Sequence, residues 1–198
     1  MSTKYNIGIG CVGSGVGQSV INSLRLSKLP ICTVGFGTNP FAYGAYDCDV
    51  FDYTLSIYDE QYINHLLKKC AEHKIDLLIP GTDDEVYIYA QNEDKLKNAG
   101  LKAIYSDIDL VSLCRNKYRM CNDMNLYVNA FSKCFQLENV EKHIAEGSLK
   151  FPCIAKFNSG FASRGIHIIH SKQDLTKLDS RYILQELAIP SSHDINRE

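Results

Sequence analysis

Short apolar stretches alternate with amphipathic segments over the first hundred residues. KYNIGIGCV, PICTVGF and IDLLIP are short and apolar, which favours three buried strands. The segment 59–73 predicts an amphipathic helix, because it repeats apolar side chains at the spacing i, i+3, i+4, i+7. These side chains are Ile63, Leu66, Leu67 and Cys70.

Two further helices and one strand complete this pattern. Gln18 to Ser27 carries apolar residues on one helical face, and Asp83 to Asn98 opens with Thr82 and Glu85 at the spacing of a capping box. LKAIYS is the fourth strand. Strands separated by helices predict an α/β fold, a Rossmann-like parallel sheet with helices on both faces.

The pattern changes after about residue 106, and we place a domain boundary between residues 1–110 and 111–198. SDIDLVSLCRNKYRMCNDMNLYV predicts one or two helices. Beyond it we expect strands at 151–156, 166–170 and 182–187, with a short helix at 172–178. This arrangement predicts a small α+β unit rather than more of the parallel sheet.

Composition and charge restrict the class of protein. The chain has 198 residues, 45% of them hydrophobic and 22% charged, which is typical of a globular protein. The net charge is −2 with no basic block, so we expect no nucleic-acid partner. No apolar run is long enough to span a bilayer and no signal-peptide core opens the chain, so we expect a cytoplasmic protein with no membrane partner.

The eight cysteines do not predict a disulfide framework. They form no CxxC pair, and most lie in apolar runs such as PICTV and FPCIA, which favours reduced, buried thiols. His167 and His170 do not predict a zinc site, because residues three apart on a strand point to opposite faces.

The turn after the first strand is rich in glycine. Gly8, Gly10 and Gly13 have the spacing of a dinucleotide-binding turn, but the second strand ends in GFGTNP without the acid that NAD-binding proteins keep for the ribose. A nicotinamide cofactor is therefore disfavoured. Two interpretations stay open: the glycines serve helix–strand packing only, or Gly13, Ser14 and Gly15 bind a small anionic substrate.

A second candidate site directly follows the strand IDLLIP. Thr82, Asp83, Asp84 and Glu85 lie at the carboxyl edge of the predicted sheet, where open α/β sheets bind ligands. Acidic residues at a helix start also suit the helix dipole, so substrate binding and a purely structural role remain equal alternatives.

Taken in order, these segments resemble the ATP-grasp superfamily, especially the branch similar to the carbamoyl-phosphate synthase large subunit. The resemblance covers nearly the whole chain, from the glycine turn and IDLLIPGTDDE through LCRNKYRM to FPCIAKFNSGFASRG and YILQELAIP. It implies a pre-ATP-grasp domain followed by the N-terminal part of an ATP-grasp domain. Asn116 departs from the family, which usually has an acid before the basic residue at the position of Lys117.

The resemblance implies ATP as the nucleotide. Lys156 would contact the α- and β-phosphates, Lys117 would be a second phosphate contact, and 160–165 would be a mobile lid in which Arg164 stabilises the transferred phosphoryl group. Glu186 would meet the adenine amino group, and Asp194 the ribose. The implied ATP-binding residues are Lys117, Lys156, Gly160, Ser163, Arg164, Gly165, Gln185, Glu186, Leu187, Ala188 and Asp194.

The family's Mg²⁺ ligands lie in the second half of the grasp, so the resemblance implies Mg²⁺ with ligands outside these residues and no complete catalytic cycle within them. The expected function is the ATP-binding portion of a ligase that activates a carboxylate as an acyl phosphate for attack by an amine or similar nucleophile. The expected partners are a small-molecule carboxylate and a second copy of the chain, since front domains of this type often pair. The alternatives are a non-catalytic nucleotide-binding or scaffolding module and, less favoured, an NAD-binding oxidoreductase domain.

Overall fold

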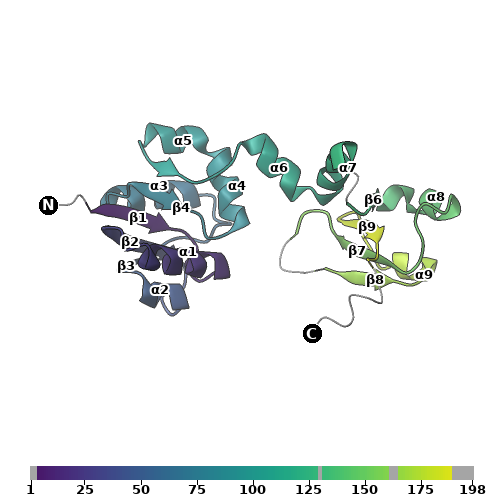
Figure 1. Ribbon diagram of the computed structural model, residues 1–198, viewed down its shortest axis with the longest axis horizontal. Helices are drawn as coiled ribbons and strands as arrows, with labels where there is room; N and C mark the ends of the chain where they lie inside the picture. Colours follow the sequence, from purple (N-terminus) through teal and green to yellow (C-terminus); the bar gives the residue numbers. More distant parts are fainter. Residues whose placement is uncertain (1–3, 129–130, 161–164, 189–198) are drawn as a thin grey trace. The chain divides into compact units, whose positions relative to one another are not determined.

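The chain folds into two compact units, residues 1–111 and residues 112–198. The structure is a computed structural model that describes residues 4–128, 131–160 and 165–188 (Figure 1). Ser163, Arg164 and Asp194 from the predicted ATP site lie outside the described residues.

The first unit is built on a parallel sheet of five strands in the order β3-β2-β1-β4-β5. The strands are β1 (Tyr5–Ile9), β2 (Ile31–Gly37), β3 (Val50–Tyr53), β4 (Leu77–Ile79) and β5 (Lys102–Ala103). Every neighbouring pair is parallel, which confirms the predicted Rossmann-like sheet. The edge strand β3 was not predicted.

Helices cover both faces of this sheet (Figure 1). They are α1 (Gly15–Leu26), α2 (Tyr43–Asp47), α3 (Tyr62–Glu72), α4 (Asp83–Gln91) and α5 (Glu93–Asn98). The single helix predicted over 83–98 is wrong, because Asn92 leaves helical geometry at φ −113° and ψ 28° and its side chain donates to the Ile88 carbonyl at 2.9 Å. The helix predicted from Asp59 begins only at Tyr62, since the Asp59 carboxylate accepts from the Gln61 amide in a local turn.

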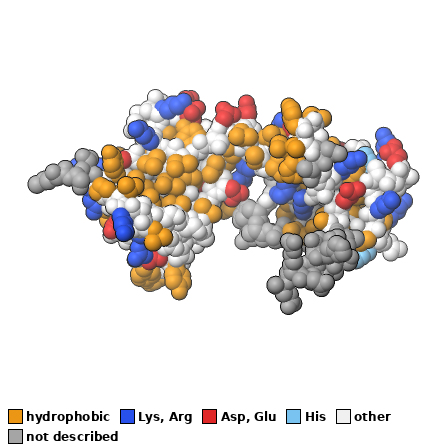
Figure 2. Space-filling view, in the orientation of Figure 1, with side chains coloured by type: hydrophobic (Ala, Val, Ile, Leu, Met, Phe, Trp, Pro, Cys, Tyr) orange, Lys and Arg blue, Asp and Glu red, His pale blue; other side chains and the backbone are white. Residues whose placement is uncertain are grey.

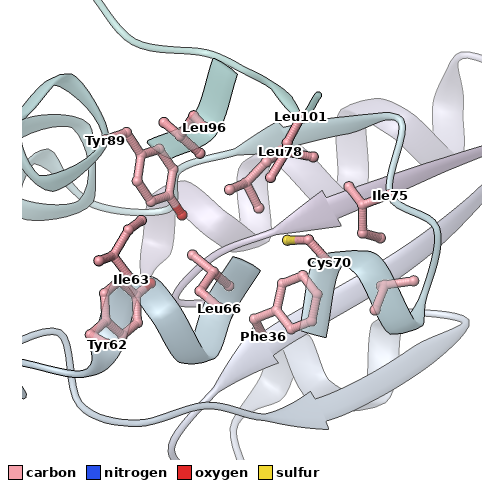
Figure 3. Packing of buried hydrophobic residues seen from close by; sticks show 11 residues of the cluster. Phe36, Tyr62, Ile63, Leu66, Cys70, Ile75, Leu78, Tyr89, Leu96 and Leu101 are labelled. Atoms are coloured by element: carbon pink, nitrogen blue, oxygen red, sulfur yellow. The ribbon is translucent and has the colours of Figure 1, made fainter. Parts of the chain in front are cut away.

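A separate hydrophobic core lies on each face of the sheet. Figure 3 shows the larger one, in which Phe36 of β2 and Leu78 of β4 pack against α3, α4 and α5. The opposite core joins Ile7 and Ile9 of β1 to Ile21 of α1. Successive residues of a strand point to opposite faces, so the central strands β1, β2 and β4 carry apolar side chains on both of their faces.

The second unit contains an antiparallel sheet in the order β6-β9-β7-β8. Its strands are β6 (Cys134–Gln136), β7 (Cys153–Phe157), β8 (His167–Ile169) and β9 (Tyr182–Glu186). The unit boundary falls within α6 (Ile108–Arg115). The other helices of the second unit are α7 (Lys117–Val128), the short 3₁₀ turn η1 (Leu137–Asn139), α8 (Val140–Ala145) and α9 (Lys172–Leu175). The α+β prediction is confirmed, although β6 and α8 were missed.

The two faces of this second sheet differ. One face carries Ala155 and Leu184 into a core with α8 and α9. On the other face Ile183 packs with Cys134 and with Cys121 of α7. Lys156 and Gln185 belong to this α7 face, because they alternate with the core residues along β7 and β9.

No helix among the described residues is long and apolar enough to cross a membrane. Basic and acidic side chains are interspersed over the described residues on the face shown in Figure 2. The eight cysteines are free thiols, and Cys70, Cys121, Cys134 and Cys153 are buried.

Candidate functional site

The turn after β1 is joined to the turn after β4 by Ser14. The Ser14 hydroxyl accepts from the Gly17 amide at 2.9 Å, so Ser14 is the N-cap of α1, and it donates to the Gly81 carbonyl at 2.6 Å. Because one hydroxyl binds both, the start of α1 and the turn after β4 are held together at the carboxyl end of the sheet.

The buried Glu85 side chain also binds the turn after β4 from inside the unit. Its side chain is fully buried, and its carboxylate accepts from the Gly81 amide at 2.8 Å, from the Tyr89 hydroxyl at 3.2 Å and from the Tyr62 hydroxyl. Burial raises the pKa of Glu85, although these donors work in the opposite direction. Burial, followed by the nearby Glu85 charge, raises the pKa of the Cys11 thiol to about 12.

Two glycines make this packing possible. A Cβ on Gly10 would lie 2.1 Å from the Glu85 Oε1, and a Cβ on Gly81 would lie 2.2 Å from the Gly10 carbonyl oxygen. The predicted role of Glu85 as a direct substrate contact is therefore wrong, because its carboxylate is enclosed and fully engaged inside the unit. The predicted capping box is also only half present: Thr82 accepts from the Glu85 amide at 3.2 Å, but the Glu85 side chain does not reach back to Thr82.

A cavity of about 290 Å³ opens beside the glycine turn. It is lined by Cys11, Gly13, Ser14, Gly37, Thr38, Asn39, Ala42, Thr54, Leu55, Ser56, Ile57 and Tyr58. These residues lie mainly at the carboxyl ends of β1, β2 and β3, the edge at which open α/β sheets bind ligands. None of these lining residues of the described chain carries a formal charge, so backbone amides, hydroxyls and apolar groups define the cavity.

Only some of the predicted substrate residues line this cavity. Gly13 and Ser14 line it, and Gly15 begins α1 directly behind them. Asp84 is connected to it through the Tyr58 hydroxyl, which donates to the Asp84 carboxylate at 3.4 Å. Thr82 and Asp83 form the start of α4, with Thr82 as the N-cap. Residues 54–58 also line the cavity, and none of them was among the predicted site residues.

In the second unit, the side chain of Lys156 is positioned by Gln185. The Lys156 ammonium donates to the Gln185 Oε1 at 2.5 Å. In the register of β7 and β9, Lys156 pairs with Ile183 and Ile154 pairs with Gln185, so the lysine and glutamine are diagonal neighbours on the same face.

Lys117 lies at the N-terminus of α7 and reaches the end of the same strand. Its ammonium donates to the Gly160 carbonyl at 2.7 Å and to the Asn158 carbonyl at 3.4 Å. Asn158 also binds the start of α7, since its carbonyl accepts from the Lys117 amide at 3.1 Å and its Oδ1 from the Tyr118 amide at 2.9 Å. The structure thus brings Lys117 to the end of β7, two residues beyond Lys156.

Asn158 is a site residue that sequence analysis did not identify. The available signal was a polar residue immediately after the predicted strand, at the start of the small-residue loop.

The two glycines that bound this loop pack on one aromatic ring. A Cβ on Gly165 would lie 2.3 Å from Phe157, and a Cβ on Gly160 would lie 3.0 Å from it. Gly165 also has φ +68°, which disfavours other residues. Both ends of the predicted lid are therefore held at Phe157, while the lid residues Ser163 and Arg164 lie outside the described chain.

The predicted adenine contacts follow the end of β9. Glu186 is the last residue of β9, and its side chain is exposed. Leu187 and Ala188 continue as irregular chain, which leaves backbone groups outside the sheet ladder. Beyond β7, at the far edge of the sheet, Ile168 of β8 and Ile166 just before it are 52% and 43% exposed, so part of this sheet offers apolar surface.

The described residues do not supply a metal site. Within 4–128, 131–160 and 165–188, no three His, Cys, Asp or Glu side chains gather in a group able to hold a metal ion. We assign no magnesium ligand to them.

Comparisons with known proteins agree with this fold. Residues 20–104 match the family model described as PylC-like, N-terminal domain. A search of the curated proteins gave no match.

Among solved structures, the chain is similar to Staphylococcus aureus N5-carboxyaminoimidazole synthetase complexed with ADP, with 18% identity and a TM-score of 0.69 over 93% of this chain and 48% of that one. It is also similar to the biotin carboxylase domain of Hydrogenobacter thermophilus 2-oxoglutarate carboxylase in complex with MgADP, ADP and bicarbonate (16% identity, TM-score 0.66, 92% and 44%). A third is the Bacillus licheniformis L-amino acid ligase (14%, 0.66, 94% and 45%).

This chain spans less than half the length of each of these three proteins. They are ATP-grasp enzymes, and the chain has the fold of the N-terminal portion of such enzymes, as the sequence predicted.

Proposed function

We propose that this chain is the ATP-binding portion of an ATP-grasp ligase, which activates a carboxylate as an acyl phosphate for attack by an amine or similar nucleophile. One observation carries the proposal: Gln185 holds the Lys156 ammonium on β7, and the Gly160 carbonyl holds the Lys117 ammonium just beyond β7, where a loop bounded by glycines begins. Two fixed cations beside such a loop suit a ligand with dense negative charge.

The two lysines would share the phosphates. Lys156 is mounted on a strand and Lys117 on the first turn of α7, so both cations have rigid supports. The loop 160–165 would cover the phosphates with backbone N–H groups and exclude water, and Arg164 would stabilise charge on the transferred phosphoryl group. The ADP and MgADP complexes of the similar structures support a nucleotide as the ligand of this fold.

The adenine would lie at the end of β9. We assign the Glu186 carboxylate to the adenine amino group, the backbone of Leu187 and Ala188 to the ring edge, and Asp194 to the ribose. The exposed side chains of Ile166 and Ile168 would provide apolar contact area for the nucleotide.

The cavity of the first unit would hold part of the acceptor substrate. Gly13 and Ser14 line it and Gly15 begins α1 behind them, and we assign Thr82, Asp83 and Asp84 at the start of α4 to the same substrate. Catalysis would rest on positioning and charge neutralisation: the phosphoryl group passes to a carboxylate oxygen with ADP as leaving group, and the nucleophile displaces phosphate. Mg²⁺, when bound, would neutralise part of the phosphate charge.

The Lys156→Ala substitution tests this proposal. We expect the Kd for Mg-ATP, measured by isothermal titration calorimetry on the full chain, to rise about 10- to 100-fold, because a charge-assisted hydrogen bond contributes about 1.5–3 kcal/mol. Lys150→Ala removes an exposed lysine just before β7 and is the matched control, with an expected change of less than twofold. The proposal is overturned if the unmodified protein does not bind Mg-ATP, or if Lys156→Ala binds it as tightly as the control.

A further inference from the structure

The side-chain amide of Gln185 has one fixed orientation. Its Nε2 donates to the Ser132 carbonyl at 2.8 Å and approaches the Cys121 sulfur at 3.9 Å. A backbone carbonyl only accepts, so the NH₂ end must face Ser132 and the Oε1 must face Lys156. A flipped amide would place oxygen against oxygen and NH₂ against an ammonium group.

Through Gln185, Lys156 is connected to the segment before β6 and to α7. Ser132 lies just before β6, and Cys121 lies on the buried side of α7 beside Cys134 and Ile183. Protein groups of β7, of α7 and of the segment before β6 therefore define the position of the amide.

A neutral acceptor has a specific advantage at this place. A free lysine side chain populates many rotamers, and binding a phosphate would otherwise have to offset the loss of that conformational entropy. Gln185 restricts the ammonium before the ligand arrives, while a carboxylate at the same position would also restrict it but would neutralise the charge that attracts phosphate.

We propose that Gln185 is a positioning residue that orders the Lys156 ammonium for the nucleotide phosphates through its own anchor on Ser132, without directly contacting the phosphates. This inference rests on the proposed function, because it requires Lys156 to bind phosphate. It assigns the side chain of Gln185 a role distinct from that of its neighbour Glu186 at the adenine.

Two substitutions test the inference. Gln185→Met keeps the length of the side chain but removes both ends of the amide. Gln185→Glu keeps an oxygen toward Lys156, adds a negative charge and loses the donor to Ser132. Gln136→Met, at an exposed glutamine of β6 in the same sheet, is the matched control.

The affinities of Mg-ATP, Mg-ADP and adenosine would be measured by isothermal titration calorimetry on the full chain, with melting temperatures as a check of folding. For Gln185→Met we expect the Kd of both phosphorylated ligands to rise about tenfold and that of adenosine to change less than twofold. For Gln185→Glu we expect a rise at least as large, because the added carboxylate neutralises the lysine. Gln136→Met should match the unmodified protein.

Each contrary outcome has one meaning. If the unmodified protein binds Mg-ATP but Gln185→Met binds it equally well, or if adenosine and Mg-ATP weaken to the same extent, the positioning role is wrong and the proposed function stands. If Gln185→Glu binds Mg-ATP as tightly as the unmodified protein, the need for a neutral acceptor is refuted. This second test remains decisive if Gln185→Met does not fold. If the unmodified protein binds no Mg-ATP, the proposed function itself fails.

Discussion

Glu85→Ala is expected to lower the free energy of unfolding of the first unit by about 3–5 kcal/mol, because it leaves several buried donors without an acceptor at a cost of about 1–3 kcal/mol each. The donors are the Tyr62 and Tyr89 hydroxyls and the Gly81 amide, all bound to the Glu85 carboxylate in the native fold. Urea unfolding followed by circular dichroism measures the loss.

The matched control for this substitution is Glu60→Ala, at an exposed glutamate in the turn before α3. Its expected effect is within about 0.5 kcal/mol, as for most surface changes. A loss of under 1 kcal/mol for Glu85→Ala would show that the hydrogen bonds to the Glu85 carboxylate do not stabilise the turns after β1 and β4.

The same carboxyl group makes stability depend on pH. Burial raises the folded-state pKa of Glu85 above the ordinary value of 4.5, so its favourable contribution is complete below pH 4.5 and is lost as the pH rises through the folded pKa. Relative to Glu85→Gln, the free energy of unfolding of the unmodified protein should therefore decrease from pH 4.5 to pH 8. A difference that is constant or increases over this range would contradict the assignment.

Gly81→Ala is expected to have the second largest effect. The added Cβ would lie 2.2 Å from the Gly10 carbonyl oxygen and 3.0 Å from that of Cys11, and both are backbone atoms that cannot rotate away. We expect a loss of about 2–4 kcal/mol, as for other severe overpacking. The turns after β1 and β4 must separate, so ligand binding in the adjacent cavity should weaken as well.

Gly15→Ala is the control for Gly81→Ala, because a Cβ at this first position of α1 would meet nothing within 4 Å. Replacing glycine by alanine in a helix should be neutral or stabilise by up to about 1 kcal/mol. Thermal unfolding of the two variants side by side would test the comparison, and equal melting temperatures would refute the steric argument.

The periodicity of the sequence was sufficient for the strong elements and insufficient for the weak ones. Strands β1, β2 and β4 have apolar residues on both faces because both faces are covered, and this gave a clear signal. Strand β3 is a four-residue edge strand whose side chains are only partly buried or exposed, so no continuous apolar run marked it. Strand β6 has three residues, too few to display a period.

The candidate site was predicted where chemistry is local and missed where it depends on packing. Lys156 and the glycines around the loop were predicted as site residues from one continuous segment. Glu85 has the sequence context of an open sheet edge, but its burial is determined by Tyr62, 23 residues away in the chain, and by the absence of a Cβ on Gly10. The bond between Lys156 and Gln185 depends on the register of β7 against β9, which periodicity does not specify.

The position of β9 has a consequence for synthesis of the chain. In the first unit β1 is central and the last strand, β5, is added at an edge, so the sheet can grow outward as translation proceeds. In the second unit the last strand is an interior one, paired with β6 on one side and β7 on the other. Until residue 186 has left the ribosome, β6 has no neighbour among the described strands and its amides remain open to solvent or to chaperones.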